Sequence, residues 1–155
     1  MITSAGLLMY RFKNGHREVL LVHPGGPFWK NKDDGSWSIP KGEADSDAEL
    51  EDLLGVAKRE FEEETSFKPH GEFKYLTSVK RKESKVVDEW MFEGDLDPNK
   101  IKSNLIEIDW PPMSGKKMQI PEIDRGLWFG LGEAKKKINQ YQIPIIEIFE
   151  DWIIK

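Results

Sequence analysis

The chain has 155 residues, of which 38% are apolar and 33% charged, enough for one compact core and too apolar for disorder, so we expect a single domain over 1–155. Its net charge of −5 argues against a nucleic-acid-binding surface and leaves a small ligand as the expected partner. No run approaches the roughly 20 apolar residues of a membrane span, and no basic segment precedes the first apolar stretch, so we expect a cytoplasmic protein without a membrane partner.

The first patterned segments predict a β-hairpin. Residues 4–12 and 18–23 are rich in strand-forming side chains, and Asn14-Gly15 between them is a strong turn signal. A loop rich in Pro, Gly and charge follows, and Trp37-Ser38-Ile39-Pro40 is expected to form a short strand before Lys41-Gly42. The loop is long enough to suggest a functional role.

A helix is predicted to start near Asp47. Ser46 and Glu49 have the spacing of a capping box, in which each side chain binds a free backbone N–H at the helix start. Apolar side chains then recur at helical spacing and predict a core-facing stripe: Leu50, Leu53, Leu54, Ala57 and Phe61.

The remaining segments predict further strands and one more helix. Residues 72–81 and 85–95 are expected to pair antiparallel, and Trp128-Phe129 to lie in a late strand. Apolar spacing in 143–154 predicts a helix. Because strands and helices alternate along the chain, we expect an α/β (α+β) sandwich.

Three carboxylates lie at the C-terminal end of the first predicted helix. Glu60, Glu63 and Glu64 lie within about a third of the helix circumference. Like charges at this spacing repel by about 0.2–0.5 kcal/mol per pair, and a divalent cation would offset that cost. The chain has no cysteine, so oxygen ligands and a hard cation such as Mg²⁺ or Mn²⁺ are favoured. An ordinary solvated acidic face is the alternative.

The surrounding sequence favours the metal site. Pro40-Lys41-Gly42 precedes the helix, and Arg59-Glu60-Phe61-Glu62-Glu63-Glu64 is followed by Thr65-Ser66-Phe67. This pattern resembles the Nudix box, and SAGLLMYR, LLVHPGGPFW, DDGSWSIPKG and PEIDRGLWF resemble a bacterial subgroup of Nudix pyrophosphohydrolases. The run WSIPKG is also similar to diadenosine polyphosphate hydrolases. The resemblance implies an α/β/α sandwich with a mixed central sheet.

The chain departs from the box at two points. Eight residues separate Gly42 from Glu51, where the box has five, and Ser66 stands where the box has Gly. Glu49 competes with Glu51 for the early Glu position. The Ser is expected to affect the turn after the helix rather than the chemistry.

The resemblance also implies roles for the box residues. Glu60, Glu63 and Glu64 would bind Mg²⁺ together with the backbone carbonyl of Gly42, and Arg59 would orient Glu60. Glu63, Glu64 and Arg59 are thus expected to be catalytic.

A further carboxylate is expected to act as a ligand or general base. The family often takes it from a loop shortly before a late Trp-containing strand, and Glu122, six residues before Trp128, has this position. Asp88, Glu89 and Glu93 compete for the role. Without the resemblance, Glu122 would be read as a solvated loop acid.

Basic and aromatic residues near the box supply the expected substrate contacts. Lys41 and Arg81 could bind phosphate groups, with Lys80 and Arg11 as further candidates. Trp29 could stack on a base because it lies in a polar loop. Such residues also commonly serve as solvated surface or core.

The leading hypothesis is a metal-dependent hydrolase that cleaves a diphosphate linkage in a nucleotide-like substrate, such as a diadenosine polyphosphate or a nucleoside triphosphate. A catalytically silent nucleotide sensor is the alternative, although all three box carboxylates are present. A diphosphate isomerase on the same fold is disfavoured by the lack of cysteine. A monomer or a homodimer is expected.

Overall fold

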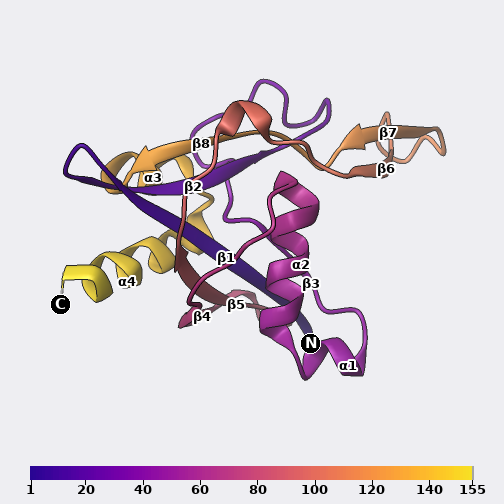
Figure 1. Ribbon diagram of the computed structural model, residues 1–155. Helices are drawn as coiled ribbons and strands as arrows, with labels where there is room; N and C mark the ends of the chain where they lie inside the picture. Colours follow the sequence, from indigo (N-terminus) through magenta and orange to yellow (C-terminus); the bar gives the residue numbers. More distant parts are fainter. Residues whose placement is uncertain (155) are drawn as a thin grey trace.

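A mixed β-sheet with helices on both faces forms the body of the computed structural model, which describes residues 1–154 (Figure 1). The elements in chain order, with 3₁₀ helices written η, are β1 (Ile2–Lys13), β2 (His16–Pro24), β3 (Lys41–Glu43), α1 (Asp47–Leu50), α2 (Leu53–Thr65), β4 (Lys74–Lys82), β5 (Lys85–Glu93), η1 (Pro98–Lys100), β6 (Leu105–Asp109), β7 (Lys117–Pro121), β8 (Ile123–Gly130), α3 (Leu131–Lys137), η2 (Gln140–Gln142) and α4 (Ile143–Ile154). None of the helices formed by residues 1–154 has the length and apolar character that a bilayer crossing requires.

The central sheet has the strand order β4-β5-β1-β2-β8, and β3 pairs with the first part of β1. Strands β1 and β5 run parallel, whereas the other pairs of this sheet are antiparallel. Helix α2 packs on one face, and α3 and α4 pack on the other. The expected α/β/α sandwich with a mixed sheet is therefore confirmed.

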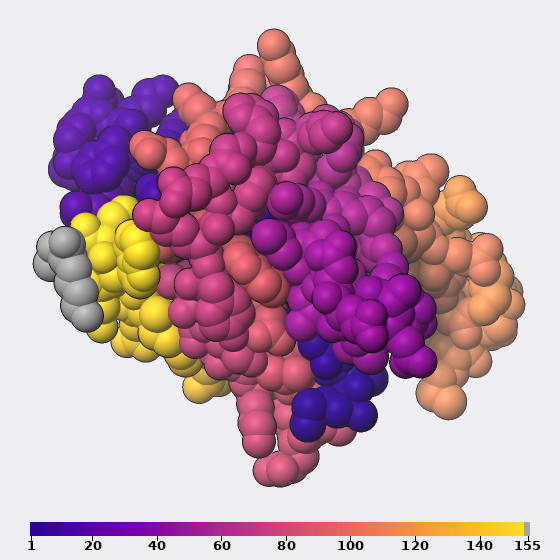
Figure 2. All heavy atoms as spheres, turned by 60° about the horizontal axis from the view of Figure 1, so that its bottom comes forward, coloured from indigo at the N-terminus to yellow at the C-terminus, as the bar shows by residue number. Residues whose placement is uncertain are grey.

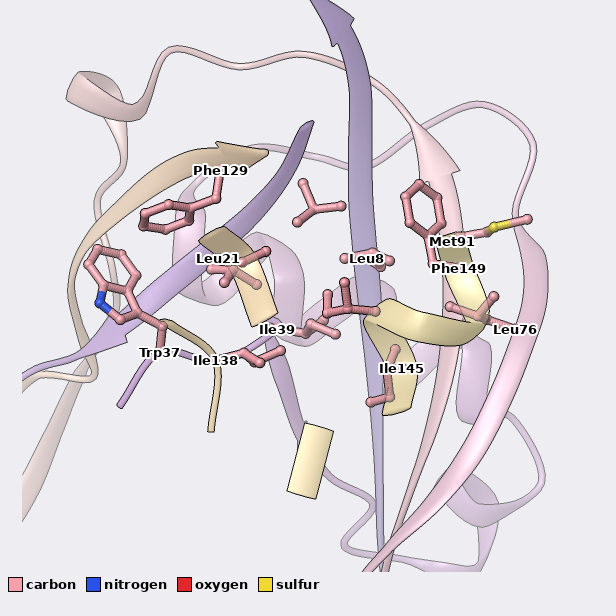
Figure 3. Close-up of a cluster of buried hydrophobic side chains, with 13 residues drawn as sticks. Leu8, Leu21, Trp37, Ile39, Leu76, Met91, Phe129, Ile138, Ile145 and Phe149 are labelled. Atoms are coloured by element: carbon pink, nitrogen blue, oxygen red, sulfur yellow. The ribbon is translucent and has the colours of Figure 1, made fainter. Parts of the chain in front are cut away.

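Alternating residues of β1 divide the core into two layers. Leu7 faces α2 and packs with Ala57 and Phe61. Full burial of a Leu or Phe side chain contributes roughly 1.5–3 kcal/mol to stability. Leu8 faces the opposite side and packs with Phe149 of α4 in the cluster shown in Figure 3. Helix α2 is thus fixed against the sheet along its apolar stripe.

Three predicted elements are confirmed with small shifts of their ends. The first hairpin turns at Asn14 (φ 53°) and Gly15 (φ 78°), the positive angles that a two-residue hairpin turn requires. Strands β4 and β5 pair antiparallel, as expected. Helix α4 covers the predicted range 143–154.

The predicted helix from Asp47 starts where expected but is not continuous. The Ser46 side chain accepts a hydrogen bond from the backbone N–H of Glu49 at 3.1 Å, as the capping box predicts. The helix then breaks at Glu51, and Asp52 caps α2 by accepting a hydrogen bond from the N–H of Gly55 at 3.1 Å. The prediction of a single helix was wrong because a second cap follows the first within six residues.

The predicted strand at Trp37–Pro40 is also displaced. Ser38 and Trp37 form only isolated bridges, to Val22 and Ile138, and the regular strand is β3 at Lys41–Glu43. Trp37 is nevertheless buried in the core cluster of Figure 3, where its ring centre lies 5.1 Å from that of Phe129 of β8. The segment contributes Trp37 to the core, and Lys41 and Gly42 directly after it pair with β1.

A second hairpin, β6–β7, was not predicted. It forms a separate two-stranded sheet and extends from the body in orange at the right of Figure 1. The space-filling view in Figure 2 shows its orange atoms beside the magenta atoms of α2. The backbone N–H of Asn104, just before β6, donates to the carbonyl of Glu63 at 2.9 Å, so the hairpin is tied to the end of α2.

Candidate active site

The second half of α2 carries three carboxylates at different depths. Glu64 is 3% exposed and lies on the same helix face as Ala57 and Phe61. The side chain of Glu60 is 13% exposed and that of Glu63 is 44% exposed. Positions three and four apart lie close together on a helix surface, so the three acids are neighbours although their exposure differs.

The surroundings of Glu64 only partly offset the cost of burying its carboxylate. Burial raises its pKa well above the usual 4.5, the charges of Glu122 and Glu60 raise it further, and Lys41 opposes the rise by its charge and a backbone hydrogen bond. Among the described residues, no group donates a hydrogen bond to its Oε2 atom. A buried acceptor left unpaired costs free energy. A hard divalent cation fits this oxygen-only cluster, because it would offset both the missing bond and the clustered charge.

The exposed side chain of Glu63 is directed towards Arg59. Its Oε1 lies 3.7 Å from Nε of Arg59. Within residues 1–154, no three acidic or histidine side chains converge into a complete metal site. Glu63 would therefore have to turn away from Arg59 for all three carboxylates to bind one ion.

Arg59 connects the two helices through their acids. Its Nη2 donates to Oε1 of Glu60 at 3.0 Å, and its Nη1 donates to Oε2 of Glu49. The hydrogen bonds to Glu49 and Glu60 raise the pKa of Arg59, so the guanidinium stays charged. Glu49, and not the exposed Glu51, takes the early acidic position that the sequence left open between them.

Gly42 lies directly beneath Glu60. A Cβ atom at this position would lie 2.0 Å from Cδ of Glu60, so any side chain would displace the carboxylate. Gly42 pairs with Ala5, which faces α2. Only glycine allows β3 and α2 to approach this closely, and the approach brings the Gly42 backbone to the acids.

Glu122 approaches the same acids from the chain segment between β7 and β8. Burial is the main cause that raises the pKa values of Glu60 and Glu64, and the charge of Glu122 raises both further. Asn104 holds it on two sides: its Nδ2 donates to Oε1 of Glu122 at 3.1 Å, and its backbone carbonyl accepts from the Glu122 N–H at 3.0 Å. Sequence reasoning missed Asn104 because an isolated Asn before a strand carries no local signal.

The three acids that competed with Glu122 have different surroundings. Asp88 accepts a hydrogen bond from the Tyr75 hydroxyl at 2.8 Å, and Glu93 is exposed. Glu89 is fully buried, and burial raises its pKa well above 4.5. It lies two positions before Met91 on β5, so both side chains face the side of the sheet opposite to α2.

Of the residues expected to contact substrate, Lys41 lies close to the box acids and Arg81 lies elsewhere. Lys41 lies beside Gly42 in β3, and its charge acts on Glu64. Trp29 lies in the loop after β2. Arg81 places its guanidinium 5.3 Å from the ring centre of Tyr141, which ties it to the layer of η2 and α4.

The sequence as a whole matches a known family. The NUDIX domain matches residues 2–147, nearly the whole chain. The chain belongs to the Nudix family. As an enzyme class, this makes it a Nudix pyrophosphohydrolase, with the box acids at the end of α2. No curated protein matches it in sequence.

Solved structures share the fold at low sequence identity. A Caenorhabditis elegans Ap4A hydrolase in a binary complex has a TM-score of 0.70 at 20% identity, over 99% of this chain and 98% of that chain. The NUDIX domain of Shewanella oneidensis NrtR, complexed with ADP ribose, has 0.65 at 16%, over 99% and 88%. The MutT protein from Methanosarcina mazei has 0.64 at 19%, over 99% and 96%. At these identities the likeness shows the fold.

Proposed function

We propose that this Nudix protein is a metal-dependent hydrolase that cleaves a phosphoanhydride bond in a nucleoside diphosphate linked to another moiety, such as a diadenosine polyphosphate or a nucleoside triphosphate. The observation that carries the proposal is the buried Oε2 of Glu64, which has no hydrogen-bond partner among residues 1–154 and whose charge is opposed by Glu60 and Glu122. Such a cluster is unfavourable as a purely structural element and suited to a cation.

The proposed metal ligands are Glu60, Glu63, Glu64 and the backbone carbonyl of Gly42, with Mg²⁺ as the cation and Mn²⁺ as a substitute. When bound, the metal neutralises the diphosphate and lowers the pKa of a water molecule. Arg59 keeps the Glu60 carboxylate in one orientation through its hydrogen bond at 3.0 Å.

Glu122 is the proposed general base for the attacking water. A general base must be held within hydrogen-bonding reach of the proton that it takes. Asn104 supplies this restraint through its hydrogen bond to Oε1 of Glu122. Lys41 is proposed to contact a phosphate group, because it lies next to Gly42 at the edge of the acidic cluster. Arg81 has less support as a phosphate contact, since it stacks on Tyr141.

A small nucleotide is the proposed partner. Two structural neighbours are described as an Ap4A hydrolase and as a domain complexed with ADP ribose, and both are nucleotide-directed. NrtR has also been solved with a 27mer DNA, but the net charge of −5 here favours a small anion bound through a metal.

The test is hydrolysis of a panel of substrates by the purified protein with and without Mg²⁺. The panel holds dinucleoside polyphosphates, nucleotide sugars, ADP-ribose and nucleoside triphosphates, with products identified by chromatography. Cleavage at one diphosphate position only with metal supports the hydrolase. Glu63→Gln and Glu64→Gln are expected to lower turnover by orders of magnitude, whereas Glu62→Gln, on the exposed side of the same helix, is the matched control. Tight binding without any cleavage would favour the sensor instead.

A further inference from the structure

Glu89 on β5 is a fully buried acid that the proposed site does not use. Its exposed fraction is 0%, and it lies on the face of the sheet that carries Leu8 and Met91, shown in Figure 3. Among residues 1–154, no group gives a hydrogen bond to either of its carboxylate oxygens. An ionised carboxylate buried in this way is strongly unfavourable. The side chain must therefore have a partner or carry a proton.

The register of three strands brings Glu89 close to the segment before the box helix. Lys41 of β3 pairs with Gly6 of β1, and Gly6 pairs with Glu89 of β5. Residues paired in this way face the same side of a sheet. A Cβ on Gly6 would lie 2.6 Å from Oε1 and 2.8 Å from Oε2 of Glu89. Because Gly6 has no side chain, Glu89 extends over β1 towards β3.

The carbonyl oxygen of Pro40 lies at the same point. It would be 2.8 Å from the same added Cβ, so three oxygen atoms surround this position beside Gly6. The Leu7 N–H donates to this carbonyl at 3.1 Å, and a carbonyl oxygen can accept a second hydrogen bond. An ionised Glu89 would place acceptor against acceptor here, whereas a protonated carboxyl group has an O–H to donate.

The surroundings of Glu89 favour the protonated form. Burial raises its pKa well above the usual 4.5, the charge of Lys41 opposes the rise, and the charge of Asp88 adds to it. Asp88 precedes Glu89 on β5 and so faces the other side of the sheet, where it accepts a hydrogen bond from the Tyr75 hydroxyl at 2.8 Å. A protonated carboxyl group therefore agrees both with the burial of Glu89 and with the nearby carbonyl of Pro40.

Pro40 is joined directly to residues of the proposed site. Lys41 and Gly42 follow it, and the Gly42 backbone packs so closely on Glu60 that an added Cβ would lie 2.0 Å from Cδ of that acid. A shift of Pro40 would thus move the Gly42 carbonyl relative to the box acids. We infer that Glu89 carries a proton and donates a hydrogen bond to the Pro40 carbonyl, and that it thereby positions the Gly42 carbonyl for the metal ion. The inference rests on the proposed function and adds a positioning residue on the opposite face of the sheet.

The test separates the hydrogen-bond donor from the charge and the size of the side chain. Glu89→Gln keeps a donor and cannot ionise, whereas Glu89→Met keeps the length of the side chain without a donor. Thr77→Val is the matched control, because Thr77 is paired with Glu89 and faces the same side of the sheet. Electron paramagnetic resonance measures Mn²⁺ affinity in titrations without substrate. Melting curves in EDTA check the fold of each variant.

A second measurement detects the proton itself. The infrared difference spectrum of wild type minus Glu89→Gln, recorded in EDTA at neutral pH, isolates the Glu89 carboxyl group. We expect the band of a protonated carboxyl group, and the band of a carboxylate would overturn the inference. This measurement depends neither on metal nor on substrate.

We expect Mn²⁺ affinity to fall by about tenfold to hundredfold in Glu89→Met, the usual effect of removing a group that orients a metal ligand. Glu89→Gln and Thr77→Val are expected to keep the wild-type affinity. An unchanged affinity in folded Glu89→Met, or a loss in Glu89→Gln, would overturn the inference and leave the proposed hydrolase intact. If Glu89→Met does not fold, the affinity of Glu89→Gln and the infrared band decide the question. A wild type that neither binds Mn²⁺ nor hydrolyses any substrate of the panel would instead overturn the proposed function, and with it the role of Glu89.

Discussion

The side-chain amide of Asn104 holds the carboxylate of Glu122 at 3.1 Å, and the backbone of the same Asn104 holds the end of α2 through Glu63. One residue therefore sets the distance between the helix that carries the box acids and the carboxylate proposed as general base. The two backbone hydrogen bonds of Asn104 do not depend on its side chain. The orientation of Glu122 can accordingly be perturbed without removing the tie to the helix.

Asn104→Ala is expected to lower kcat by about tenfold to hundredfold with little change in KM. A hydrogen bond to a charged group contributes about 1.5–3 kcal/mol, and each 1.36 kcal/mol corresponds to about tenfold in rate. Steady-state kinetics and a melting curve check this outcome, with the exposed Asn99→Ala as control. An unchanged kcat would remove Asn104 from the proposed positioning role. A raised KM at constant kcat would assign it to substrate binding.

Gly42→Ala tests the close approach of β3 to α2. The added methyl group would meet Glu60 at Cδ, so the carboxylate must move away from its place beside Arg59. Turnover is expected to fall by about a hundredfold or more, because a misplacement of about 1 Å can have this effect. Gly132→Ala, where a Cβ would meet nothing within 4 Å, is the matched control and should retain full activity. Full activity of Gly42→Ala would show that Glu60 is not needed where it lies.

The placement of the box acids on one helix face could be predicted from the sequence, because these acids are local to one helix. The spacing of Leu53, Ala57 and Phe61 gives the buried face of α2, and Glu64 falls on that face. The cap at Asp52 also had a local signal, since its partner Gly55 lies three residues later. The alternating Ile106 and Ile108 of β6 also form a local strand pattern. These features were within reach of sequence reasoning.

The rest of the site depends on tertiary contacts. Asn104 and Glu122 are 18 positions apart, and no local pattern predicts that they meet. The choice of Glu49 over Glu51 as the partner of Arg59 depends on the break between α1 and α2, which turns one acid inward and leaves the other exposed. Burial of Glu89 depends on Gly6 of the neighbouring strand, whose missing side chain leaves room for the carboxylate.

Divalent metal should stabilise the wild-type fold through Glu64. A ligand that binds only the folded state adds about 2.7 kcal/mol of stability at a concentration of 100 times its dissociation constant. The melting temperature of the wild type is expected to rise with Mg²⁺, and that of Glu64→Gln to change much less. Thermal denaturation in EDTA and in excess Mg²⁺ checks this, with Glu62→Gln expected to behave like the wild type. The same metal response in Glu64→Gln as in the wild type would argue against Glu64 as a ligand.

Glu89→Gln is expected to stabilise the protein at neutral pH. Burial raises the pKa of Glu89 well above 4.5, so the folded state holds its proton over a range of pH in which the unfolded state has released it. Stability of the wild type therefore falls as pH rises from about 4.5 towards that raised pKa, because the folded state then binds more protons than the unfolded state. Gln cannot ionise, so the advantage of the variant should be largest at neutral to alkaline pH and vanish below the ordinary pKa of Glu. Melting curves from acid to alkaline pH in EDTA measure the difference, with Glu83→Gln in the exposed turn before β5 as control. A stability difference that does not depend on pH would show that a lost contact, and not the titration of Glu89, separates the two proteins.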